Sequence, residues 1–216
     1  MKKKIVAEFL GTAFLLIGVV GSGIMAERLS GDQTAIALLA NAIATGCILY
    51  SIITVLAPIS GAHFNPAVTI AFLLRRELTL FTSLAFICAQ IFGGIFGVWA
   101  SHVMFDLNIL QTSTNIYRTG QAQWVAEVIA TFGLLFVIFG GLKSRPDAIP
   151  ALVALYITGA YWFTASTSFA NPAVTIARGF TDTFTGIHLD HITGFIIAQF
   201  IGVIIAHISL RSLFAK

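Results

Sequence analysis

The chain has 216 residues, of which 57% are hydrophobic and only 10% are charged. Average soluble domains carry roughly 25% charged residues, and a mean hydropathy of +0.93 argues against a soluble globular protein. The formal net charge of +3 comes from scattered residues that form no basic patch, so the sequence does not indicate a nucleic-acid partner.

Apolar runs long enough to cross a lipid bilayer recur along the whole chain. A transmembrane helix requires about 20 mostly apolar residues. In chain order, the runs cover residues 5–26, 35–58, 78–105, 124–142, 149–166 and 191–213. We therefore predict an all-α membrane protein with six transmembrane helices.

A seven-residue motif, Asn-Pro-Ala-Val-Thr-Ile-Ala, occurs twice, at residues 65–71 and 171–177. Asparagine is a favoured helix N-cap and proline suits the first helical position, so each copy predicts the start of a helix. Both copies lie between apolar runs, so we expect two re-entrant half-helices of about 10 residues that meet N-terminus to N-terminus inside the membrane. The motif residues are Asn65, Pro66, Ala67, Asn171, Pro172 and Ala173.

The two halves of the chain repeat around these copies. Residues 7–16 match residues 126–135, and each half reads as span, span, half-helix, span. An odd number of full spans places the second half in the bilayer with the opposite orientation. We therefore predict a single transmembrane channel domain, 1–216, built as an inverted repeat of residues 1–106 and 122–216.

Basic residues in the loops indicate the orientation. One side of a six-span topology carries Lys2, Lys3, Lys4, Arg75, Arg76, Lys143, Arg145, Arg211 and Lys216. The other side carries Arg28, Arg118 and Arg178. Basic loops stay in the cytoplasm according to the positive-inside rule. We predict a multi-pass protein of the cell (inner) membrane with cytoplasmic N- and C-termini.

The asparagines of the motif explain how such half-helices could serve a pore. A helix that begins inside the membrane leaves its first N–H groups unpaired, which is costly in lipid. The side-chain oxygens of Asn65 and Asn171 can cap these groups, and their NH2 groups then remain as donors to a neutral acceptor, such as a water or alcohol oxygen. The two positive helix ends oppose protons and cations. This arrangement predicts a passive channel for small uncharged solutes.

Three further polar residues are candidates for a role near the pore. Glu8 and Glu127 are carboxylates within predicted spans, where ionisable groups are functional candidates by default. We favour a supporting role, in which each accepts hydrogen bonds from the pore-loop backbone of its own half. A proton relay through them would instead indicate a proton-coupled secondary transporter, which stays the alternative. His63 either lines the cytoplasmic part of the pore or satisfies loop backbone.

The doubled Asn-Pro-Ala motif, residues 60–64 before its first copy, and the repeated Ala-Glu and Ala-Gln pairs resemble the aquaporin (major intrinsic protein) family. The resemblance covers nearly the whole chain. It implies six spans plus two re-entrant half-helices, a pore in each subunit, and a homotetramer in the lipid bilayer.

The resemblance also implies a selectivity filter, whose positions fall by spacing on Thr45, Gly159, Ser168 and Val174. Many family members carry an arginine at the last position. Four small, weakly polar residues imply a filter wider than one water molecule, which suits glycerol and other polyols, urea, and neutral metalloid hydroxides such as arsenite, besides water. Arg178 lies one helical turn beyond Val174. It either guards the vestibule or is a solvated residue near the helix end.

The sequence contains no recognisable catalytic set, so we predict that the protein is not an enzyme and uses no cofactor. His188, Asp190 and His191 are close in sequence at the outer end of the last predicted span. We do not interpret them as a metal site.

Overall fold

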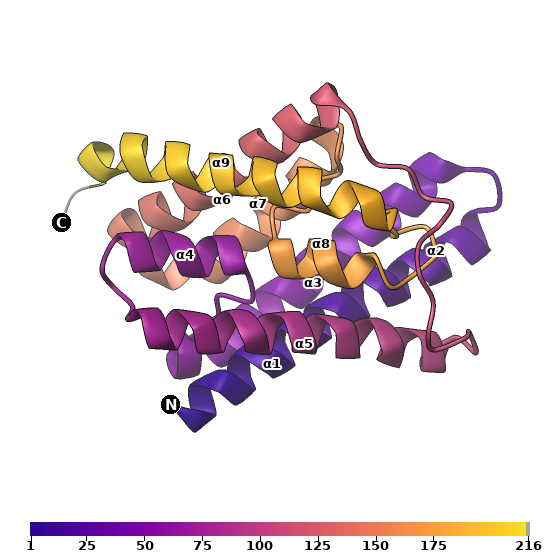
Figure 1. Ribbon diagram of the computed structural model, residues 1–216, viewed down its shortest axis with the longest axis horizontal. Coiled ribbons are helices and arrows are strands. Elements are labelled where there is room, and N and C mark those ends of the chain that lie inside the picture. Colours follow the sequence, from indigo (N-terminus) through magenta and orange to yellow (C-terminus); the bar gives the residue numbers. More distant parts are fainter. Residues whose placement is uncertain (215–216) are drawn as a thin grey trace.

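The computed structural model describes residues 1–214 and contains only helices and loops across that part of the chain (Figure 1). The first half comprises α1 (Lys2–Leu16), η1 (Ile17–Gly21), α2 (Ser22–Ser30), α3 (Thr34–Ser60), α4 (Pro66–Leu74) and α5 (Leu80–Met104). The second half comprises α6 (Gln121–Ser144), η2 (Pro146–Ala148), α7 (Ile149–Phe163), α8 (Pro172–Arg178), η3 (Leu189–His191) and α9 (Ile192–Leu213). Lys216, counted above among the inner basic residues, lies outside the described residues.

Five helical stretches within residues 1–214 are long and apolar enough to cross a membrane. They are Lys2–Ser30, Thr34–Ser60, Leu80–Met104, Gln121–Ser144 and Leu189–Leu213. The remaining predicted span, 149–166, corresponds to α7, which has only 15 residues. It ends three residues earlier than predicted because the backbone becomes extended at Thr164, where the loop toward α8 begins.

The first span contains a feature that the apolar pattern did not predict. A π-helical turn, η1, interrupts the α-helical geometry between α1 and α2. Such wide turns leave a carbonyl group without its usual partner. Here the Asn41 side chain of α3 donates to the Val19 carbonyl at 2.8 Å and to the Ser22 hydroxyl at 2.9 Å. The polar residue inside an apolar span is therefore used to satisfy the irregular turn.

The short helices α4 and α8 lie end to end among the long helices (Figure 1). They contain 9 and 7 residues, so they are about 13 and 10 Å long at about 1.5 Å per residue. The prediction of two half-helices is confirmed, but both are shorter than the expected length.

Close packing of equivalent helix pairs surrounds these two half-helices. In the first half α1 packs against α5, in the second half α6 packs against α9, and α3 and α7 pack across the halves. Small residues allow the backbones to approach: a Cβ atom added to Gly202 of α9 would lie 2.8 Å from the Val128 carbonyl oxygen of α6. Large apolar side chains such as Phe92 and Ile208 point outward, 66% and 71% exposed, as expected for helices that face lipid.

Candidate functional site

The two motif asparagines cap the half-helices as the sequence predicts. Both have extended backbones, with φ of −156°. The Asn65 Oδ1 atom accepts a hydrogen bond from the Ala67 N–H at 2.8 Å. The Asn171 Oδ1 atom accepts from Ala173 at 3.0 Å and from Val174 at 3.3 Å. These bonds satisfy N–H groups that would otherwise be buried without partners.

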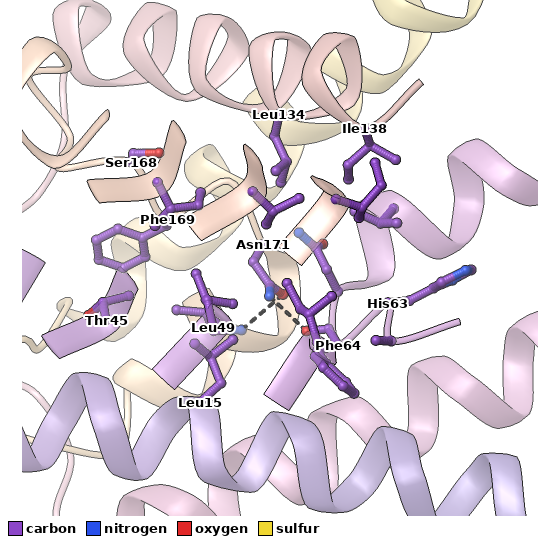
Figure 2. A pocket seen from close by; sticks show the side chains of 18 of the residues that line it. Leu15, Thr45, Leu49, His63, Phe64, Leu134, Ile138, Ser168, Phe169 and Asn171 are labelled. Atoms are coloured by element: carbon purple, nitrogen blue, oxygen red, sulfur yellow. Dashed lines mark hydrogen bonds between the residues drawn. The ribbon is translucent and has the colours of Figure 1, made fainter. Parts of the chain in front are cut away.

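Each asparagine also binds the opposite half of the chain. The Asn65 amide donates to the Ala170 carbonyl at 2.7 Å. The Asn171 amide donates to the Phe64 carbonyl at 2.8 Å (Figure 2). The accepting residues precede the asparagines and have left-handed backbones, with φ of 47° at Ala170 and 49° at Phe64. One N–H group of each amide therefore joins the halves, a contact that the sequence did not predict. The other finds no partner within residues 1–214.

Both asparagines line a cavity of about 110 Å³ between the two halves. Most of its wall is apolar, as the side chains in Figure 2 illustrate. The apolar lining residues include Leu15, Val19, Leu49, Ile53, Val68, Leu134, Ile138, Val153 and Ile157. The polar side chains of the lining are the two asparagines and Thr45, His63, Tyr161, Ser168 and Arg178.

Three of the predicted filter positions, Thr45, Ser168 and Val174, line the cavity, and Gly159 does not. Gly159 is exposed on the outside of α7, where an added Cβ atom would meet only Phe163, at 3.9 Å. Counting back from the second motif fails here because the length of the loop between α7 and α8 sets which residue of α7 faces inward.

Tyr161 takes the place that the spacing assigned to Gly159. It belongs to a stripe with Val153 and Ile157, spaced by four residues, which faces the cavity. Its hydroxyl lies 3.2 Å from the Thr45 hydroxyl. Spacing from the second motif did not predict a role for Tyr161, although the four-residue spacing along α7 indicates that it faces inward.

The Glu8 carboxylate holds the loop that precedes α4. Its oxygens accept from the Ser60 hydroxyl at 2.6 Å, the His63 N–H at 3.0 Å, the Phe64 N–H at 2.7 Å and the Gln90 amide at 2.8 Å. The side chain is fully buried. The expected contact with the pore-loop backbone is therefore present.

Glu127 repeats this arrangement in the second half. It accepts from the N–H groups of Phe169 and Ala170, both at 2.9 Å, and from the Gln199 amide at 2.6 Å. It too is fully buried. Four donors around one carboxylate and at least three around the other leave little capacity for an additional proton-relay partner.

His63 contributes its ring to the cavity lining at the α4 end. The Nδ1 atom lies 3.1 Å from the Thr69 hydroxyl, and the ring packs 4.7 Å from Phe72 between centroids. Its backbone N–H, not its side chain, contacts Glu8.

At the opposite end, Arg178 lines the cavity and is only 2% exposed. Its Nε–H donates to the Thr185 carbonyl, and its guanidinium carbon lies 3.5 Å from the centroid of the Phe169 ring. The alternative of a solvated arginine at the helix end was therefore wrong.

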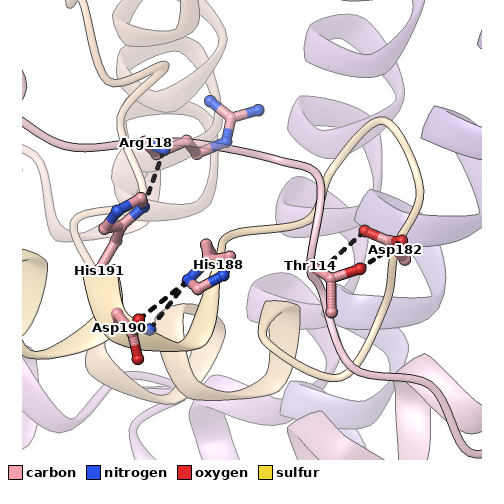
Figure 3. A network of polar contacts seen from close by, with 6 residues as sticks. All are labelled: Thr114, Arg118, Asp182, His188, Asp190 and His191. Atoms are coloured by element: carbon pink, nitrogen blue, oxygen red, sulfur yellow. Dashed lines mark hydrogen bonds and ion pairs between the residues drawn. The ribbon is translucent and has the colours of Figure 1, made fainter.

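The loops at this end are tied together by polar contacts (Figure 3). The Arg118 backbone N–H donates to His191 Nδ1 at 3.2 Å, and the Asp190 N–H donates to His188 Nδ1 at 3.3 Å. Burial lowers the pKa of the Arg118 guanidinium, but arginine still stays charged at neutral pH. Within residues 1–214, no group of three or more His, Cys, Asp or Glu is arranged to hold a metal ion.

The chain is similar to known proteins in sequence and in fold. The model of the family described as "Major intrinsic protein" matches residues 1–166. The chain is 51% identical over 211 residues to aquaglyceroporin AqpS of Rhizobium meliloti (strain 1021), covering 98% of this chain and 90% of that protein. It is 31% identical over 176 residues to aquaporin-5 of Homo sapiens, covering 73% and 64%. The solved aquaglyceroporin of Plasmodium falciparum shares the fold, with a TM-score of 0.76, 23% identity, and 99% and 97% covered.

Proposed function

Because the chain belongs to the major intrinsic protein family, we propose that the cavity between its two halves is the permeation path for small uncharged solutes. The protein is a passive membrane channel and not an enzyme. One observation carries the assignment of the path: Asn65 and Asn171 bind each other's half head to head, inside a cavity whose wall is otherwise mostly apolar.

The two asparagines then act as the central hydrogen-bond donors. Each amide has a second N–H after one is used to join the halves. A solute that enters the cavity gives up hydrogen bonds to water where the wall is apolar. It forms new hydrogen bonds with the two asparagine amides. The positive ends of α4 and α8 point toward the same place and make it unfavourable for a cation, as is general for pores of this kind.

We assign the filter to Thr45, Tyr161, Ser168 and Val174. The Ser168 hydroxyl is buried beside the cavity and has no hydrogen-bond partner within the described residues. Ser168, like Thr45, lines the cavity, so this part of the wall carries small hydroxyl residues. Together with an aliphatic residue at 174, this favours glycerol, urea and neutral metalloid hydroxides such as arsenite in addition to water. The name of the similar protein AqpS, an aquaglyceroporin, agrees with the choice of glycerol.

We also propose a homotetramer in the cell (inner) membrane, with cytoplasmic termini and a single channel domain formed by the repeats 1–106 and 122–216. The order α1, α3, α4, α5 recurs as α6, α7, α8, α9, which supports the repeat. The bias of basic residues toward one side supports the orientation.

Stopped-flow measurements on proteoliposomes test the function. We expect passive, non-saturating flux of water, glycerol, urea and arsenite above that of protein-free liposomes. Flux of water alone would contradict the wide filter. Solute flux that saturates and depends on a proton gradient would contradict the passive channel and favour the proton-coupled transporter, which no comparison supports.

A further inference from the structure

Two arginines lie at the end of the cavity that the connections 105–120 and 179–188 cover, which we call the outer mouth. Arg178 ends α8, four residues after Val174, and therefore lies about 6 Å farther along the helix axis. It lines the cavity, with its guanidinium carbon 3.5 Å from the Phe169 ring centroid. A positive charge thus stands beside the path although residue 174 is aliphatic.

Arg118 reaches the same ring from the connection between the two halves. Its guanidinium carbon lies 5.4 Å from the Phe169 centroid. Its Nε–H donates to the Gly186 carbonyl at 2.9 Å, and its own backbone is held by His191. Two elements that are distant in sequence therefore bring two guanidinium groups to one aromatic side chain.

The buried Glu127 carboxylate attracts both charges without touching either guanidinium group. Within the described part of the chain, neither guanidinium group forms an ion pair with a carboxylate. The partners of Arg178 and Arg118 are backbone carbonyl groups and one hydroxyl group. A buried cation whose direct contacts are neutral dipoles still acts on the adjoining cavity, because the protein interior screens charge less than bulk water does.

We propose that Arg178, which lines the cavity one helical turn beyond Val174, and Arg118, which packs against the same Phe169 ring, form a cation barrier at the outer mouth. The inference rests on the proposed permeation path. It explains how a filter without arginine can be wide enough for glycerol and still reject monovalent cations. An arginine at position 174 would select solutes by size and by charge at one place. Here the filter selects by size, and the two arginines at the outer mouth select by charge.

Urea and guanidinium provide the test, because they have nearly the same planar shape and differ by one charge. The flux of both is measured in proteoliposomes containing the parent chain, Arg118→Gln, Arg178→Gln, Arg178→Lys or the double Gln variant. Arg28→Gln is the matched control, because Arg28 also lies over an aromatic ring, 5.2 Å from the Phe105 centroid, but that ring, unlike Phe169, does not line the cavity.

The barrier predicts that the ratio of guanidinium to urea flux rises about tenfold or more in the Gln variants, which corresponds to about 1.4 kcal/mol. The ratio should stay near the parent value in Arg178→Lys and Arg28→Gln. An unchanged ratio in Arg118→Gln, in protein that still conducts urea, overturns the inference. If Arg178→Gln does not fold, the Arg118 variants decide alone. Absence of urea flux in the parent chain would instead contradict the proposed function.

Discussion

At the scale of single residues, Asn65 and Asn171 each use both ends of one amide. The oxygen caps the residue's own half-helix, and the nitrogen binds a carbonyl of the opposite half. Aspartate could perform only the first role, because a carboxylate has no N–H donor and would face the carbonyl with a negative charge. The donor role is therefore the one that distinguishes asparagine at these positions.

Replacing Asn171 by Asp should therefore weaken the junction and the pore together. The Phe64 carbonyl loses its donor, and an unsatisfied buried polar group costs about 1–3 kcal/mol. We expect a lower thermal unfolding temperature in detergent and solute flux reduced on the order of tenfold. Asn108→Asp, the same change at an exposed loop position, is the control. Unchanged flux in Asn171→Asp would contradict the donor role.

Val174 sets the width of the proposed filter. Arginine at this position would extend a long cationic side chain into the cavity, so glycerol flux should fall more than water flux. Stopped-flow measurement of both fluxes tests this expectation. Val174→Met adds length without charge and separates the two effects. Equal loss of both fluxes in Val174→Arg would show that residue 174 is not part of the filter.

Substitutions at Tyr161 and at Gly159, both in α7, should affect the ratio of glycerol to water flux differently. Tyr161→Ala removes the side chain that meets Thr45, so the ratio of glycerol to water flux should rise. Gly159→Ala changes the outer face of α7 and should leave that ratio unchanged, while a helical alanine in place of glycine stabilises by about 0.5–1 kcal/mol. A shift of the flux ratio in Gly159→Ala with none in Tyr161→Ala would restore the filter assignment derived from spacing.

At the scale of elements, the buried carboxylates position the loops that lead into the half-helices. In Glu8→Gln, one acceptor oxygen is replaced by an NH2 group that faces existing donors, and hydrogen bonds to charged groups are worth about 1.5–3 kcal/mol each. We expect a clear loss of thermal stability and a matching loss in Glu127→Gln, whose environment is equivalent. Glu27→Gln, on the exposed end of α2, is the control. A stable Glu8→Gln variant that lost only proton-dependent transport would instead support a relay.

Some features of these elements could be predicted from the sequence, and others could not. Long apolar runs and the doubled Asn-Pro-Ala motif were sufficient for the long helices, the half-helices and the caps, because these depend on local composition and on the first turn. The π-helical turn depends on its contact with Asn41 of α3, which no local pattern records. The four-residue spacing along α7 indicates that Tyr161 faces inward, but not that its hydroxyl meets Thr45 of α3. The amide bonds between the halves depend on carbonyl directions set by two left-handed residues, Phe64 and Ala170.

At the scale of the whole molecule, the connection between the two halves is attached to the loop after α8 at the outer mouth. The Asp182 carboxylate, on the loop after α8, accepts from the backbone N–H group of Thr114 at 3.0 Å (Figure 3). It also accepts from the backbone N–H group of Asn115 at 3.1 Å. The Ser113 N–H donates to the Gly179 carbonyl beside it, at 2.9 Å. The segment that carries Arg118 is therefore fixed to the second half near its middle and again at His191.

This attachment should respond to acid. Slight burial raises the pKa of Asp182, but the hydrogen bonds from Asn115 and Thr114 outweigh it, and the pKa lies below its ordinary value. A lowered folded pKa gives stability that is present above the unfolded pKa, about 3.9, and is lost as the pH falls through the folded value. Hydrogen exchange at the Thr114 and Asn115 amides, expressed as protection relative to the intrinsic rate, should therefore drop below about pH 4. Asp182→Asn should abolish that pH dependence, and Asp32→Asn, at an exposed position on the α2–α3 connection, should retain it. Protection that is independent of pH in the parent chain would show that the carboxylate does not hold the connection.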